Sequence, residues 1–309
     1  MRPDDSAALP PGLSVMERGW LSSNNVLLLG PDQAALVDSG YGLHAPQTLA
    51  LVESALQGRP LDLLVNTHLH SDHCGGNAVL QARYPQLQTL IPPGHAQAVA
   101  AWDENVLTYQ ATGQMCPRFG FSATLQPGSE VQMGAARWQV HAAPGHDTHS
   151  VILFEPASRT LISADALWQR GFGVVFPELD GEDAFDEVAD TLDVIESLCP
   201  RTVIPGHGPV FSDVAEALAF ARKRLEGFAA SPAKHLQYAA KVLLKFKLLE
   251  LQSVQRSALL QWASSTPYFQ SLFTRQFSGL GFAEGLDLLI QDLVRANAAE
   301  LRGDLVLDR

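Results

Sequence analysis

The sequence of 309 residues predicts an α/β fold that continues into a helical C-terminal extension. Short apolar segments alternate with segments of helical periodicity as far as about residue 212, and from Asp213 onward only helical periodicity recurs. A hydrophobic fraction of 46% allows a chain of this length to bury a large core. We therefore expect a body at residues 1–212 and an extension at residues 213–309.

The body should alternate strands and helices in chain order. Its expected strands are short apolar runs bounded by polar or turn residues. They are residues 25–29, 34–37, 61–65, 88–91, 137–141, 151–154, 160–162 and 202–204. Helical spacing of apolar residues predicts helices at residues 44–56, 76–84, 95–102 and 182–198.

The extension should consist of helices. The same spacing predicts them at residues 213–229, 232–251, 255–264 and 283–301. Pro232 stands at the start of the second of these, where its missing N–H costs nothing.

A histidine-rich run directly follows the apolar segment 61–65. It carries three imidazoles and one carboxylate within six positions, with the spacing H-x-H-x-D-H. Side chains of a strand alternate between two faces, so these groups can converge only if they lie on a loop beyond the strand's end. Neutral imidazole and carboxylate are ligands typical of zinc and similar divalent metals. The residues are His68, His70, Asp72 and His73.

Three later segments also end in potential metal ligands. Each is an apolar run that meets a ligand-type residue at or just before a turn rich in proline or glycine. The ligand-type residues are His146, Asp165 and His207. Open α/β architectures generally place their sites at such strand ends.

Together these seven residues resemble the signature of the metallo-β-lactamase superfamily. The segment from Ala35 to Gly40, which contains Asp38, resembles the first motif of that family. The motifs extend from about Asp38 to His207, two-thirds of the chain. The resemblance implies an αββα sandwich for the body, with a helical or winged-helix-like C-terminal extension as an addition to it.

The resemblance also implies two metal sites. His68, His70 and His146 would hold the first divalent ion, Asp72, His73 and His207 the second, and Asp165 would bridge them. We expect zinc at both sites, with iron or manganese as alternatives, because imidazole and carboxylate accept all three metals. Asp38 would act behind the ligands by fixing the loop or the tautomer of a ligand histidine.

Two segments beside the expected site could shape a substrate pocket. The run after Asp165 is aromatic and rich in glycine, and we expect Trp168 or Phe172 in it to contact substrate. Residues 102–121 have no clear periodicity, which is typical of lids and binding loops.

Charge is divided unevenly between the two parts. The body carries 9 Lys and Arg against 23 Asp and Glu, whereas the extension carries 12 against 10. On a helix over residues 232–251, Lys234, Lys241 and Lys245 fall within one narrow sector. The stripe is either an ordinary solvated face or a docking surface for an anionic group of the substrate, through Lys241 and Lys245.

Hydrolysis of an ester-like bond is the function expected first, in a thioester or a lactone. A metal-bridging hydroxide would attack the carbonyl, and Asp72 would assist departure of the leaving group. Glyoxalase II, which this chain resembles, likewise follows its metal-binding domain with a helical region that supplies basic residues for a thiol carrier. That likeness favours a thioester and a small anionic or acyl substrate.

Two alternatives remain open at this stage. The first is a metal-dependent phosphodiesterase similar to lactamase-like endoribonucleases, whose C-terminal segment is helical and winged-helix-like. The acidic body disfavours a nucleic-acid partner because it would repel a polyanion. The second is a metal-binding effector without turnover.

Cysteine content and hydropathy suggest a compartment. The three cysteines are widely separated and show no C-x-x-C spacing, as in reduced proteins. Residues 1–5 include no apolar segment of the kind found in secretory signals, and no run of about 18 uncharged apolar residues occurs. We expect a cytoplasmic protein with no membrane partner.

Overall fold

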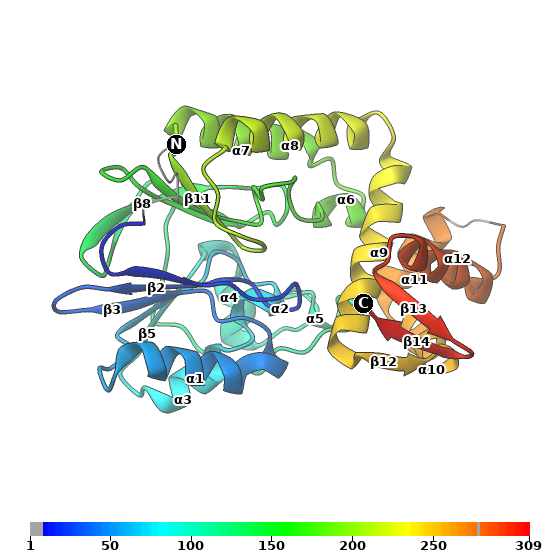
Figure 1. Ribbon diagram of the computed structural model, residues 1–309, viewed down its shortest axis with the longest axis horizontal. Helices are drawn as coiled ribbons and strands as arrows, with labels where there is room; N and C mark the ends of the chain where they lie inside the picture. The colour runs from blue at the N-terminus through cyan, green and yellow to red at the C-terminus, as the bar shows by residue number, and fades with distance from the viewer. Residues whose placement is uncertain (1–8, 277–278) are drawn as a thin grey trace, which may run out of the picture.

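The computed structural model describes residues 9–276 and 279–309. Residues 1–5, on which the expectation about secretion rests, lie outside the described residues. The body is an αββα sandwich: two β-sheets face each other, and helices cover the outer face of each (Figure 1). The fold class predicted from the sequence is therefore confirmed.

The first sheet contains six strands in the order in which they follow along the chain, β1-β2-β3-β4-β5-β6. The first three strands pair antiparallel, and the pairs from β3 to β6 are parallel. The strands are Leu13–Met16, Asn25–Leu29, Ala34–Val37, Leu63–Val65, Gln88–Ile91 and Ala123–Thr124. Because β3 and β4 are parallel, the loops after both strands emerge at one edge of the sheet.

The second sheet has the order β11-β10-β9-β8-β7. Its strands pair antiparallel except for β10 and β11, which are parallel. They are Glu130–Met133, Ala136–Ala142, Val151–Glu155, Thr160–Ala164 and Thr202–Pro205. The parallel pair places the residues that follow β10 and β11 at a common edge.

Alternation along the strands builds a core on each face of the first sheet. Val26 and Leu28 of β2 point between the sheets, where they join a cluster that includes Trp138 of β8. Leu27, between them, points outward and packs with Leu56 beneath the helices of this side. The helices of this layer are α1 (Ala45–Leu56), α3 (Asn77–Arg83) and, further along the sheet, α4 (Ala96–Ala101), preceded by the 3-10 turns η1 (Gly42–His44) and η2 (Pro93–His95).

Two long helices cover the second sheet: α7 (Phe185–Leu198) and α8 (Val214–Ala229). The buried side of α8 shares one apolar cluster with α7 and with residues of β9 and β10. Figure 1 shows both helices lying across the top of the sandwich. We propose on this packing that α8 belongs to the sandwich and that the extension begins beyond it, later than the boundary expected at residue 212.

The extension combines helices with a small sheet. The helices are α9 (Pro232–Leu251), α10 (Arg256–Ser265), α11 (Pro267–Gln276) and α12 (Phe282–Arg295). The strands are β12 (Ser253–Gln255), β13 (Ala299–Arg302) and β14 (Leu305–Asp308), in the antiparallel order β12-β14-β13. This order, with helices between the first strand and the last two, is that of a winged-helix module.

The periodicity of the extension predicted helices alone and missed these three strands, whereas the winged-helix-like form considered for it includes them. The strands are three or four residues long, which is too short for a strand period to be distinguished from the helical pattern around them. The helix expected over residues 283–301 ends at Arg295, because Asn297 adopts a left-handed conformation (φ 56°) and the chain turns into β13. Within the described residues, no helix is long and apolar enough to cross a membrane.

Candidate metal centre

The histidine-rich run leaves the end of β4 and forms a loop with a single helical turn, α2 (Ser71–Cys74). Leu69 turns into the apolar core at 2% exposure, which leaves the flanking imidazoles on the other side of the chain. Gly75 lies so close to the loop after β3 that a Cβ would stand 2.2 Å from the backbone nitrogen of Gly42. The absence of a side chain there lets the run pack against that loop.

A first cluster joins this run to the loop after β8. The ligand-type nitrogens of His68, His70 and His146 lie within 4.8 Å of one another. His70 Nδ1 and His146 Nε2 face each other at 2.8 Å, and His146 Nδ1 lies 2.5 Å from the carbonyl oxygen of Val174. That carbonyl can only accept, so it holds the proton of His146 on Nδ1 and leaves Nε2 with a free lone pair.

A second cluster joins the same run to the loop after β11. Ligand atoms of Asp72, His73 and His207 also lie within 4.8 Å of one another. His207 Nε2 is 3.1 Å from Asp72 Oδ2, and His73 Nε2 is 3.9 Å from the same oxygen.

Asp165, which follows β10, lies between the two clusters. Its Oδ2 is 3.4 Å from His146 Nε2, whereas its Oδ1 is 3.5 Å from His73 Nε2. One carboxylate therefore presents one oxygen to each cluster. This approach requires glycine at position 206, where a Cβ would lie 2.2 Å from Asp165 Oδ1.

Asp38, at the end of β3, holds the loop from behind. Its Oδ1 accepts a hydrogen bond from the backbone N–H of Thr67 at 2.9 Å, and Oδ2 lies 2.8 Å from His73 Nδ1. The carboxylate fixes the His73 proton on Nδ1, so the lone pair of Nε2 points into the second cluster. The structure thus places Asp38 against both the loop and a ligand-type imidazole.

The donor set fits a divalent metal. His68 Nε2 and His73 Nε2 are buried and lack any hydrogen-bond partner among the described residues. Buried polar atoms are rarely left unpaired, and two imidazole lone pairs converging beside a carboxylate are the ligands that zinc-like cations take. These residues could therefore hold a divalent cation.

Electrostatics favour the ligand forms of His68, His70 and Asp165. Burial and neighbouring imidazoles lower the pKa of His68 well below its usual value, and burial with the nearby His146 lowers the pKa of His70 to about 4. Burial opposes ionisation of Asp165, but His207 and His73 outweigh it and lower the pKa of that carboxyl. Neutral imidazole and ionised carboxylate are the states that bind metal.

A narrow cavity of about 80 Å³ opens onto both clusters. Trp168 donates from Nε1 to Asp165 Oδ1 at 3.2 Å, as expected for a residue beside the site. Trp20, from the loop between β1 and β2, stacks on His207 with ring centroids 5.4 Å apart. Phe176 packs against His70 at 4.6 Å, and Gln114, from the segment expected to form a lid, also lines the cavity.

A wider cavity of about 450 Å³ adjoins the narrow one and shares four lining residues with it: Trp20, Trp168, Val242 and Phe246. Its walls are mostly apolar and also include Arg170, Arg224 and Lys241. Within the described part of the chain, none of these three cations forms an ion pair with a carboxylate. The cationic surface expected on α9 therefore includes Lys241 and lies beside the site.

Two residues that were expected to contact substrate are engaged in other contacts in the structure. Lys245 lines the wide cavity, but its ammonium binds Asp308 Oδ1 at 2.6 Å and two backbone carbonyls, so it joins α9 to β14. Phe172 is 1% exposed and lies in the core beneath α7 and α8. Glycines on both sides of Phe172 let the chain turn this ring inward, so the expectation that it contacts substrate was wrong.

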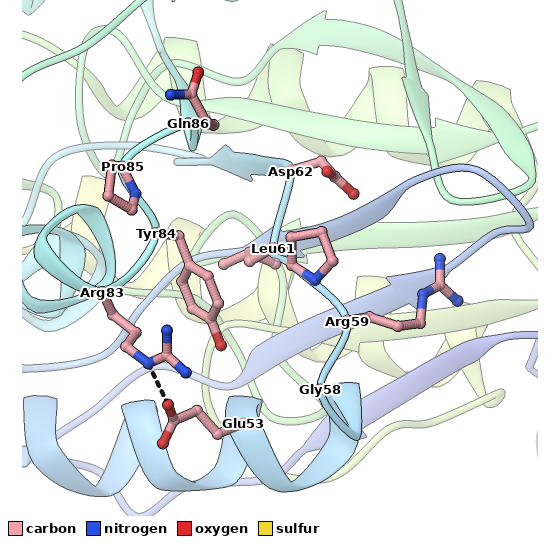
Figure 2. Close-up of a pocket in the computed structure, with 10 residues that line it drawn as sticks. Glu53, Gly58, Arg59, Leu61, Asp62, Arg83, Tyr84, Pro85 and Gln86 are labelled. Carbon is pink, nitrogen blue, oxygen red and sulfur yellow. Dashed lines mark hydrogen bonds and ion pairs between the residues drawn. The ribbon is translucent and has the colours of Figure 1, made fainter.

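Another surface cavity, of about 350 Å³, lies on the side of α1 and α3 (Figure 2). The figure shows Glu53 and Arg83 paired across it, at 2.5 Å. None of its lining residues belongs to the two clusters.

Two residues around the site could not have been predicted from the sequence. Trp20 and Phe246 are brought to the cavity by a loop and by a helix far from the ligand motifs. An isolated aromatic residue has no spacing that distinguishes a cavity wall from core, so neither position carries a usable signal.

Comparison with known proteins places this geometry in a family. The family model described as metallo-beta-lactamase superfamily matches residues 18–207. The chain belongs to the metallo-beta-lactamase superfamily. The matched residues run from just before Trp20 to His207 and include both clusters of this superfamily protein.

Relatives within the superfamily are hydrolases by name. A hydroxyacylglutathione hydrolase of Brucella anthropi is 26% identical over 206 residues, 66% of this chain and 66% of that protein. The acyl-coenzyme A thioesterase MBLAC2 of Homo sapiens is 25% identical over 224 residues, 64% of this chain and 78% of that protein. A hydroxyacylglutathione hydrolase of Stenotrophomonas maltophilia is 34% identical, but the match covers half of each chain.

Solved structures agree on the fold. A metallo-beta-lactamase family protein from Thermus thermophilus has a TM-score of 0.55 at 20% identity and covers 98% of this chain and 100% of its own. A Cronobacter sakazakii metallo-beta-lactamase has a TM-score of 0.58 at 17% identity and covers 72% of this chain and 93% of its own. The superfamily fold thus accounts for the sandwich, and the first likeness extends over the C-terminal extension.

Proposed function

We propose that this protein is a dinuclear metal-dependent hydrolase that cleaves a thioester, with a lactone as the next candidate. The observation that carries the proposal is the position of Asp165, whose two oxygens face two separate ligand clusters at 3.4 and 3.5 Å. Such a carboxylate suits a bridging ligand between two cations.

The residues of the site would bind two cations, orient the carboxylate between them and assist the leaving group. Two bound divalent cations, zinc first and iron or manganese otherwise, would acidify water and polarise a carbonyl. Trp168 would orient the bridging carboxylate through its Nε1–H, and Asp72, at the cavity wall, or the second metal would assist departure of the leaving group. The metal ligands would be His68, His70 and His146 on one side, Asp72, His73 and His207 on the other, and Asp165 between them.

The wide cavity supports a thioester of an anionic carrier. Its apolar walls suit an acyl or thioether portion. Arg170, Arg224 and Lys241, which form no ion pair with a carboxylate among the described residues, suit carboxylate or phosphate groups. The names of two relatives, hydroxyacylglutathione hydrolase and acyl-coenzyme A thioesterase, both denote thioesters of this kind.

Phosphodiester cleavage is the second candidate, favoured by the winged-helix order of the small sheet. Charge on the extension argues against it. Arg256 is paired with Asp287, Arg295 with Asp292, and Arg302 with Glu300. Cations already paired with carboxylates offer little attraction to a polyanion.

Metal analysis and a substrate panel test the proposal together. We expect close to two equivalents of metal per chain, and turnover of an acyl thioester well above that of a lactone or of bis-p-nitrophenyl phosphate. Turnover of the phosphodiester alone would overturn the thioester assignment. Metal binding without turnover of any substrate would favour the effector interpretation, and a chain that binds no metal under replete conditions would contradict the dinuclear site.

A further inference from the structure

Asp147 follows His146 directly but belongs to neither ligand cluster. It is 8% exposed. Its Oδ1 accepts a hydrogen bond from the backbone N–H of His149 at 2.8 Å, and its Oδ2 lies 3.7 Å from His70 Nε2. Among the described residues, that imidazole is its one ion-pair contact, while the rings of His95 and His149 pack edge to face nearby.

The two ring nitrogens of His70 face in opposite directions. Its Nδ1 faces the first cluster, 2.8 Å from His146 Nε2, and its Nε2 faces away from the cluster toward Asp147. A neutral imidazole carries one proton. The Nδ1 lone pair is available to a cation only when that proton is on Nε2.

We propose that Asp147 is a positioning residue for His70, whose carboxylate holds the ring proton on Nε2 and leaves the Nδ1 lone pair toward the first cluster. Asp38 lies behind His73 on the opposite ring nitrogen, within hydrogen-bond distance at 2.8 Å, whereas Asp147 and His70 are 3.7 Å apart and would have to move closer when the cation binds. Carboxylates behind ligand imidazoles commonly set tautomer and ring orientation in this way. The inference rests on the proposed metal binding.

The variant Asp147→Asn distinguishes a role in positioning His70 from a role in holding the turn at His149. Asparagine has the same shape, and its Oδ1 can still accept the His149 N–H and keep the turn. Its amide nitrogen then replaces Oδ2, so a donor faces His70 Nε2 and favours the tautomer with the proton on Nδ1. A residue that only holds the turn would tolerate this change.

Asp62→Asn is the matched control. Asp62 also accepts one backbone N–H, from Ala34 at 2.8 Å, but it lies at the surface cavity of Figure 2, away from both clusters. Both variants therefore lose one carboxylate charge while keeping an acceptor for a backbone amide.

Competition with a chromogenic chelator measures zinc affinity, and the melting temperature of the metal-free proteins checks the fold. We expect one zinc equivalent to bind about 10–100-fold more weakly in Asp147→Asn, with wild-type affinity in Asp62→Asn. Wild-type affinity in Asp147→Asn would overturn the inference and leave the proposed function intact. A wild-type protein that binds no zinc would instead overturn the proposed function.

A proton spectrum of the zinc-loaded wild-type protein gives a second measurement if Asp147→Asn does not fold. We expect the Nε2–H proton of His70 to resonate downfield and to exchange slowly with water, because Asp147 accepts it. A rapidly exchanging proton would overturn the inference.

Discussion

The pKa values of His68 and His73 are shifted in opposite directions because the neighbours of the two rings differ. Burial and adjacent imidazoles lower the pKa of His68 well below the usual value for histidine. Burial acts in the same direction on His73, but the carboxylates of Asp165 and Asp38 outweigh it and raise its pKa well above that value. The carboxylates beside His73 therefore distinguish it from His68, although both histidines belong to the same loop.

Lys241 provides a test of substrate docking at the residue scale. Replacing it with glutamate puts a negative charge into the wide cavity, where the ammonium forms no ion pair among the described residues. We expect KM for an anionic thioester to rise about 5–20-fold, equivalent to about 1–2 kcal/mol, with little change in kcat. Steady-state kinetics with an anionic and a small neutral thioester would measure it.

Lys234→Glu is the matched control for this change. It makes the same charge reversal on the same helix, but Lys234 does not line the cavity. An equal rise in KM for both variants, or for the neutral substrate, would contradict docking at Lys241.

At the scale of elements, α9 connects the extension to the segment that follows Asp165. His235, near the start of α9, accepts a hydrogen bond at Nε2 from the backbone N–H of Val175 at 3.1 Å. The ring is 1% exposed. Burial, with the positive charges of Arg224 and Arg275, lowers its pKa to about 4, so the folded protein keeps it neutral.

This contact predicts how stability depends on pH. Between about pH 6.5 and 4 the unfolded chain binds a proton at His235 that the folded chain does not, so stability falls as pH falls through this range. The full effect is at most about 3 kcal/mol. We expect His235→Gln to remove this part of the slope, measured as the free energy of unfolding in urea at a series of pH values.

The control for His235 is His141→Gln, on the half-exposed side of β8. Burial lowers the pKa of His141 as well, but this ring is partly exposed, so the slope should change less in this variant than in His235→Gln. A slope in His235→Gln as steep as in the wild type would show that His235 titrates normally in the folded state.

On the scale of the whole molecule, α9 is shared by two structures. Val242 and Phe246 line both cavities beside the metal centre, whereas Leu244 and Leu248 belong to the core of the extension. Figure 1 shows α9 standing between the sandwich and the remaining helices. The extension therefore supplies a wall of the site as well as its own core.

Leu289 in α12 tests the extension core. It is fully buried, and we expect Leu289→Ala to lower the free energy of unfolding by about 2–5 kcal/mol, through lost burial and the cavity left behind. Urea unfolding followed by tryptophan fluorescence measures it, since Trp262 packs against the same core. Leu288→Ala, at a 40% exposed position of the same helix, should cost less than about 1 kcal/mol. Equal losses in both variants would contradict this placement of α12.

The sequence by itself determined the alternation of strands and helices and the residues that gather in the two clusters, whereas the αββα arrangement was expected from the family resemblance. Strand and helix periods are local, and the residues His68 to His73 lie in one loop, so both can be recognised without knowledge of distant contacts. His146, Asp165 and His207 were predictable because each follows an apolar run, and strand ends meet at one edge of a sheet.

Only the tertiary structure decided which residues surround the two clusters and how the extension ends. Phe172 turned into the core, Lys245 found Asp308 at the other end of the extension, and Trp20 came to lie on His207. The strands β12 to β14 are too short to show a period and form only because they pair with one another. The physical reason is the same in each case: these positions are fixed by contacts between residues far apart in the chain, and local spacing contains no information about such contacts.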